Sequence, residues 1–137
     1  MEETWVFNKD SGEFKRKAIA NTIIPSGSRI IVANAFSLAM LPQKSHCVLD
    51  IFRITEEDVK EILRMYQWIS AVGHESTAEL LTKKLGINIP CNRATVTLEK
   101  KTALLVAQLM GPRKECREMS REEIEKYPID FFLIYVE

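Results

Sequence analysis

Residues 70–93 (SAVGHESTAELLTKKLGINIPCNR) constrain the fold most, because they predict one amphipathic helix with a polar entrance. Ser76 is placed to cap this helix, and Glu79, three residues later, is placed to complete a capping box. Gly86 is placed to end it. At helical spacing the apolar residues fall on one face, which carries Ala78, Leu81 and Leu85.

Short apolar runs on both sides of this helix predict the strands of a sheet. They cover residues 30–33, 47–53, 94–98, 104–107 and 131–136. Two capping-box patterns, Thr55 with Asp58 and Ser120 with Glu123, predict the starts of further helices. In residues 94–98 apolar side chains alternate with threonines, which is typical of a half-buried strand. Residues 131–136 are apolar on both faces, so they form either a central strand or an edge strand covered by another subunit. The pattern predicts an α/β fold with a mixed sheet flanked by helices.

The length of 137 residues fits one domain. We place that domain at residues 29–137, preceded by an N-terminal extension over residues 1–28 in which residues 5–7 and 13–15, joined by a turn-like segment, predict a hairpin. Residues 15–17 (KRK) form a basic cluster, interpreted as a solvated edge in preference to a nucleic-acid contact.

Charge and composition exclude several functional classes. Nineteen basic and nineteen acidic residues cancel, which argues against binding duplex DNA through bulk electrostatics. Two histidines and three widely spaced cysteines make a histidine-rich metal site or a disulfide framework improbable. No apolar run is long enough to span a membrane, and the N-terminus lacks the pattern of a signal peptide. We expect a cytoplasmic protein with reduced thiols.

Polar residues at the helix entrance suggest a phosphate site. The first turn of a helix has unpaired N–H groups and the positive end of the helix dipole. Gly73 allows a ligand close to the backbone, and His74 is able to transfer a proton. Asn34 and Ser37 follow the first strand, where ligands often bind, but composition alone favours local turn hydrogen bonds as the explanation for both residues. Gln108 interrupts an apolar strand, so it either bonds neighbouring backbone or faces a polar cavity.

Four motifs together resemble the viral type III anti-CRISPR ring nuclease family. They are NAFS (residues 34–37), SAVGHESTA (residues 70–78), the Asn92-Arg93 pair and the closing strand that begins Phe131-Phe132. The likeness runs from about Ile30 to the C-terminus in similar order and spacing. GHEST followed by the amphipathic helix and the downstream pair is its most specific part.

The resemblance implies a homodimer that closes over cyclic tetra-adenylate at the subunit interface. Family members cleave this second messenger to linear di-adenylates with 2′,3′-cyclic phosphate ends, without a metal or other cofactor, and so inhibit type III CRISPR defence. His74 matches the catalytic histidine, which acts as general acid, and Glu115 matches an assisting glutamate. The positions that match ligand-binding residues are Asn34, Ser37, Ser76, Thr77, Arg93 and Gln108.

The sequence departs from the family after Gln108. Relatives have an arginine three residues before the glutamate, but here Pro112 occupies that place and Arg113 is the nearest guanidinium. Either Arg113 replaces the family arginine as a catalytic residue, or it is a solvated loop residue. In the second case the alternative function is a non-catalytic protein that sequesters cyclic oligoadenylate. A nucleic-acid-binding regulator is a third possibility, for which residues 15–17 are the only feature.

Overall fold

The computed structural model describes residues 5–8, 13–16, 24 and 27–137. At the N-terminus, β1 (Trp5–Asn8) and β2 (Glu13–Arg16) pair antiparallel. Lys17 of the basic cluster lies outside the described residues. The domain boundary at residue 28 stays a prediction. In the part of the chain that the structure describes, no helix has the length and apolar character needed to cross a membrane.

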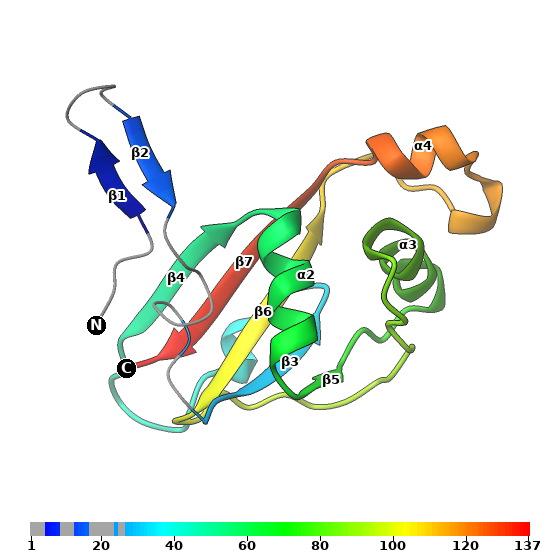
Figure 1. Cartoon of the computed structure of the whole chain (residues 1–137). Coiled ribbons are helices and arrows are strands. Elements are labelled where there is room, and N and C mark those ends of the chain that lie inside the picture. The colour runs from blue at the N-terminus through cyan, green and yellow to red at the C-terminus, as the bar shows by residue number, and fades with distance from the viewer. Residues whose placement is uncertain (1–4, 9–12, 17–23, 25–26) are drawn as a thin grey trace.

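A five-stranded mixed sheet forms the centre of the molecule, in the order β4-β7-β6-β3-β5 (Figure 1). Its strands are β3 (Arg29–Ala33), β4 (Leu49–Ile54), β5 (Trp68–Ser70), β6 (Thr102–Leu109) and β7 (Ile129–Val136). Strand β3 runs parallel to β5 and β6, whereas β7 runs antiparallel to β4 and β6. The predicted α/β fold with a mixed sheet is confirmed. Strand β7 lies inside the sheet, which decides between the two alternatives for residues 131–136.

Two helices cover one face of the sheet. Helix α2 (Glu56–Met65) begins with the predicted capping box, in which the Asp58 N–H donates to Thr55 Oγ1 at 3.1 Å and the Thr55 N–H to Asp58 Oδ2 at 2.9 Å. Helix α3 (Glu75–Leu85) ends at Gly86, whose φ of 70° is left-handed as predicted. The apolar faces of both helices join one core, which includes Val59, Ile62, Ala78, Leu81, Leu85, Ile30, Val32, Leu105 and Leu133.

The opposite face is covered by irregular chain, and here the prediction of a strand at residues 94–98 is wrong. Val96 and Leu98 are buried between exposed threonines, as the alternation predicts. They pack on the face of the sheet, against Ile31 and Leu104, beside the short 3-10 helix η1 (Leu38–Met40). The Leu98 N–H donates to the Met40 carbonyl at 2.7 Å. The segment lies across the face of the sheet and therefore does not join its edge.

The connection from β6 to β7 forms an arm beside α3 (Figure 1). It contains the 3-10 helix η2 (Cys116–Glu118) and helix α4 (Arg121–Lys126), which begins with the predicted Ser120–Glu123 capping box. A small apolar cluster of Leu80, Cys116, Ile124 and Tyr127 fixes the arm to α3. The arm thereby brings residues 111–118 to the N-terminal end of that helix.

Candidate functional site

Helix α3 begins two residues earlier than the capping box requires, so the Ser76 prediction is wrong in detail. The N-cap residue is His74, and the helix starts at Glu75 with no side-chain cap. Ser76 Oγ instead accepts a hydrogen bond of 2.8 Å from the backbone N–H of Cys116. The Ser76 hydroxyl therefore binds the arm and does not cap the helix. The N-cap residue makes no side-chain hydrogen bond to the first turn.

Hydrogen bonds fix the segment that leads into the helix. Ser70 Oγ donates to the Pro90 carbonyl at 2.6 Å, and Asn92 Nδ2 donates to the Ser70 carbonyl at 2.6 Å. The next residue, Arg93, donates from Nε to the Gly73 carbonyl at 3.0 Å. A Cβ added at Gly73 would lie 3.1 Å from Arg93 Cγ, so the arginine stem packs directly on the glycine. Asn92 therefore holds the backbone, while Arg93 lies beside the helix entrance.

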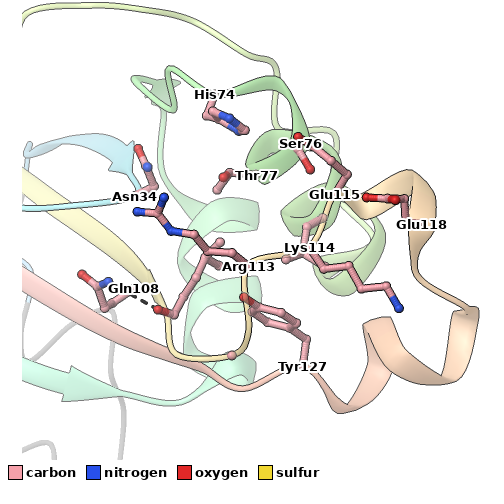
Figure 2. A pocket seen from close by; sticks show the side chains of 13 residues that line it. Asn34, His74, Ser76, Thr77, Gln108, Arg113, Lys114, Glu115, Glu118 and Tyr127 are labelled. Atoms are coloured by element: carbon pink, nitrogen blue, oxygen red, sulfur yellow. Dashed lines mark hydrogen bonds between the residues drawn. The ribbon is translucent and has the colours of Figure 1, made fainter.

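A cavity of about 610 Å³ opens at this entrance, between α3, the end of β6 and the arm (Figure 2). Most of the predicted site residues line it: Asn34, His74, Ser76, Thr77, Gln108, Arg113 and Glu115. Asn34 is half-buried after β3, Thr77 is buried in the first turn of α3, and His74 is exposed. Residues from three separate parts of the chain thus converge on one space.

Gln108 both bonds neighbouring backbone and faces a polar cavity, the two alternatives that the sequence left open. Its side chain lines the cavity, and Nε2 donates to the Leu109 carbonyl at 3.4 Å, a long and weak hydrogen bond (Figure 2). The side chain is exposed to solvent, so no buried polar group needs a partner. Its amide is thus available to a ligand.

The arm directs Arg113 into the cavity. The Tyr127 hydroxyl donates to the Pro112 carbonyl at 3.0 Å, and the Tyr127 ring lies so close to Gly111 that an added Cβ would be 2.8 Å from it. Beyond this turn Arg113 extends toward Asn34, whereas Lys114 turns the other way and pairs with Glu123 at 2.7 Å (Figure 2). Arg113 and His74 thus line the same cavity, although Pro112 and not Arg113 occupies the position that the resemblance predicts for an arginine.

The same end of the molecule has a second cavity, of about 650 Å³, on the other side of His74. His74, Ser76 and Glu115 line both cavities. The remaining walls of the second cavity are formed by Gly73, Glu75, Glu79, Cys91, Arg93 and Arg117. Ser37 is exposed beside η1 and lines neither cavity, so the structure does not bring it to the other predicted residues.

Several lining residues were missed from sequence. Tyr127, Lys114 and Glu118 line the first cavity and Arg117 the second, and nothing local in the sequence distinguishes them from ordinary residues of a charged loop and a helix end. The Lys114 ammonium, with the Ser120 N–H, lowers the pKa of Glu123 outside the cavity. Within the described residues, no group of three histidine, cysteine or carboxylate side chains is placed to share a metal ion.

Comparison with known proteins agrees with this fold. The chain is 32% identical to protein 26 of Sulfolobus islandicus filamentous virus over 108 residues, which cover 78% of this chain and 91% of that protein. It is 33% identical over 84 residues to the YddF protein of Bacillus subtilis, covering 60% and 78% of the two chains. Among solved structures, B116 of Sulfolobus turreted icosahedral virus superposes with a TM-score of 0.67 at 25% identity, over 79% of this chain and 99% of that one.

A sequence model of one family covers most of the domain described above. The matched region, residues 30–133, begins in β3 and ends in β7, so it includes all or most of each strand of the five-stranded sheet, together with α2, α3 and the arm. The chain belongs to the STIV B116-like family.

Proposed function

We propose that this protein is a ring nuclease that cleaves cyclic tetra-adenylate to linear di-adenylates and thereby inhibits type III CRISPR defence. The observation that supports this most strongly is the convergence of His74, Arg113 and Glu115 on one cavity. These residues come from the α3 entrance and from the arm, which are far apart in sequence. A histidine, a carboxylate and a guanidinium around one cavity are able to supply the acid, the base and the charge stabilisation that promote phosphodiester cleavage.

The reaction is an in-line attack within the substrate. The 2′-oxygen of one ribose forms a bond to the adjacent phosphorus, the bond from phosphorus to the 5′-oxygen breaks, and a 2′,3′-cyclic phosphate remains. Glu115 takes the proton of the 2′-hydroxyl, and His74 gives a proton to the departing 5′-oxygen. Imidazole suits this role because histidine ordinarily titrates near neutral pH.

Charge on the phosphorane is balanced by two features of the cavity. Arg113 presents a planar guanidinium able to donate two parallel hydrogen bonds to phosphate oxygens. The first turn of α3 adds unpaired N–H groups and the positive end of its dipole, because His74 provides no side-chain cap. Asn34, Thr77 and Gln108 remain to orient the ribose and base.

We further propose that a homodimer holds the ring. A cavity of about 610 Å³ is within the size range of sites for drug-sized ligands, and a ring of four nucleotides is larger than such a ligand. Two protomers related by a twofold axis would each hold half of it. The apolar composition of β7 does not support the dimer, because β7 lies inside the sheet and this position explains its apolar side chains. Light scattering should give the mass of a dimer; a monomeric mass with and without the ring would contradict it.

The alternative is a protein that sequesters the ring without cleaving it. The displacement of the arginine by one position, caused by Pro112, favours this alternative, because in-line attack is sensitive to the placement of charged groups. Recovery of intact ring after prolonged incubation, together with tight binding unaffected by His74→Ala, would establish it.

The experiment that tests the proposed nuclease compares the two histidines of the chain. His74 lines both cavities, whereas His46 is exposed and lines neither. We expect His74→Ala to lower kcat for cyclic tetra-adenylate by at least about a hundredfold, the range for loss of a general acid, and His46→Ala to have wild-type activity. Equal activity of both variants would show that His74 is not the acid.

A further inference from the structure

Helix α3 holds the arm at two polar points with an apolar contact between them. Ser76, Leu80 and Lys84 follow one another at intervals of four residues, so they lie along one side of the helix. Ser76 accepts the hydrogen bond from the Cys116 N–H, and Leu80 joins the apolar cluster that fixes the arm. Lys84 lies roughly 12 Å beyond Ser76 along the helix axis. From there its Nζ donates to the Glu125 carbonyl at 2.7 Å.

The ammonium of Lys84 occupies the C-terminal end of α4. The last carbonyls of a helix have no following turn to bind them, and they form the negative end of its dipole. Besides Glu125, Nζ contacts the Ile124 carbonyl at 3.4 Å, and it lies 3.7 Å from Glu56 Oε1 at the start of α2. Only 10% of the Lys84 side chain is exposed, whereas lysine is ordinarily an exposed residue. This cation is therefore committed to the end of α4.

The end of α4 is also where the contact that directs Arg113 begins. Tyr127 is the C-cap residue of α4 and follows closely on the carbonyls that Lys84 binds. Its hydroxyl donates to the Pro112 carbonyl, and its ring packs on Gly111. A displacement of the end of α4 would therefore move Tyr127 and, with it, the turn that precedes Arg113.

We propose that Lys84 is a positioning residue of the proposed active site, which holds the end of α4 and, through Tyr127, places Arg113 in the first cavity. This inference rests on the proposed function. Lys84 lines neither of the cavities at the entrance of α3, so it acts on a bound ring only through other residues. Its effect on cleavage should depend on the presence of Arg113, whereas the effect of a general loss of stability should not.

A double-mutant cycle between Lys84 and Arg113 tests this dependence. Lys84→Met keeps the length of the side chain and removes its charge. We expect it to lower kcat/KM for cyclic tetra-adenylate about tenfold when Arg113 is present, because a small displacement of a catalytic group is costly, and less than about twofold in an Arg113→Ala background. A tenfold loss in both backgrounds would overturn the positioning role, and so would wild-type kcat/KM in the single variant.

Lys60→Met is the matched control. Lys60 lies 3.5 Å from Glu56, the carboxylate that Lys84 also approaches, and its other partner is Glu57 at 3.7 Å, so both contacts are within α2. Lys60→Met should have wild-type kcat/KM. Equal losses in Lys60→Met and Lys84→Met would show that pairing with Glu56, and not the contact with α4, is what matters.

Lys84→Arg serves in the same cycle if Lys84→Met does not fold. It keeps the positive charge but changes the shape of the head group and the position of its donors. We expect a loss of about threefold in kcat/KM when Arg113 is present and none in an Arg113→Ala background. Equal losses in the two backgrounds would overturn the positioning role in the same way.

Alkylation of Cys116 reports the position of the arm without any cleavage. Cys116 is 1% exposed and belongs to the apolar cluster between the arm and α3, so its thiol reacts only when the arm opens. We expect Lys84→Met to raise the rate of its reaction with iodoacetamide at least about fivefold, and Lys60→Met to leave the rate unchanged. An unchanged rate in Lys84→Met would show that this lysine does not hold the arm.

These measurements separate failure of the positioning role from failure of the nuclease. If the wild type cleaves the ring and Lys84→Met does so at the wild-type rate, the nuclease stands and the positioning role is wrong. If the wild type binds the ring without cleaving it, the cycle is measured on Kd, and a weakening by Lys84→Met that requires Arg113 supports the role in a binding protein. If the wild type neither cleaves nor binds the ring, both are wrong.

Discussion

Ser76 Oγ accepts a hydrogen bond of 2.8 Å from the backbone N–H of Cys116, and this contact joins the first turn of α3 to the arm. The two residues are 40 positions apart in sequence. Glu115 immediately precedes the donor, so the hydrogen bond sets the position of the proposed catalytic carboxylate relative to His74. Ser76 is thus a positioning residue as well as part of the cavity wall.

Ser76→Ala should reduce both stability and turnover. It leaves the N–H of the buried Cys116 without a partner, which costs roughly 1–3 kcal/mol of the free energy of unfolding. Displacement of Glu115 should lower kcat by roughly tenfold to a hundredfold. Thr55→Ala, which removes the cap of α2 and costs about 1 kcal/mol, is the control for stability alone and should keep wild-type kcat. Equal kcat in both variants would show that Ser76 does not position the carboxylate.

Gly111→Ala should displace the turn that directs Arg113. The added Cβ would lie 2.8 Å from the Tyr127 ring, which is closer than carbon atoms approach, so the loop or the buried ring must move. We expect a loss of about 1–3 kcal/mol in the free energy of unfolding, typical of overpacking, together with reduced cleavage. Urea denaturation measures the first effect. In a Tyr127→Ala background the clash with the ring disappears and only the 3.1 Å contact with Pro128 Cδ remains, so Gly111→Ala should then cost less; an unchanged cost would contradict the contact with the ring.

Arg113 and Lys114 are neighbouring cations whose substitution should have very different effects on cleavage. Arg113 extends into the cavity, whereas Lys114 is paired with Glu123. Arg113→Ala should lower kcat/KM for cyclic tetra-adenylate by about a hundredfold, as loss of one group that stabilises an oxyanion does. Lys114→Ala removes the same charge and should change kcat/KM by less than about threefold, as expected for an exposed ion pair. Comparable losses in both would indicate a general electrostatic effect.

The buried thiol of Cys116 should respond to alkaline pH. Burial raises the pKa of the Cys116 thiol above its ordinary value of 9.0, and the nearby Glu79 carboxylate raises it further. The folded state therefore keeps this proton at a pH where the unfolded state has lost it, so the stabilisation is complete below pH 9 and is lost as the pH rises through the folded pKa. Denaturation of wild type and Cys116→Ala between pH 8 and about 11 should show a steeper decline for the wild type. An equal decline in the free energy of unfolding with pH for both proteins would contradict the raised pKa of the Cys116 thiol.

Local sequence signals predicted most of the framework. The Thr55–Asp58 and Ser120–Glu123 capping boxes and the left-handed Gly86 each depend on neighbouring residues, and all are present as predicted. Strand β5 was missed because three residues are too few to show a period. The alternation of Val96 and Leu98 with exposed threonines indicates only that one side of the segment is buried. A strand produces this pattern, but so does an irregular segment that packs on the face of a sheet.

Features of the site that depend on distant contacts were not predictable. Ser76 satisfied a local capping pattern, but its hydroxyl binds a backbone N–H 40 residues away. The placement of Arg113 depends on the Tyr127 contact with Gly111 and Pro112, which no spacing rule indicates. The family resemblance, and no local pattern, grouped Asn34, His74 and Gln108; in the structure all three line one cavity, and their role in binding stays a prediction.

The most direct test of the account is to incubate excess wild-type protein with cyclic tetra-adenylate in EDTA and to identify the products by mass spectrometry. The arrangement of His74, Arg113 and Glu115 predicts linear di-adenylates that end in a 2′,3′-cyclic phosphate, formed at a rate that EDTA does not change. Intact ring after prolonged incubation would contradict the account.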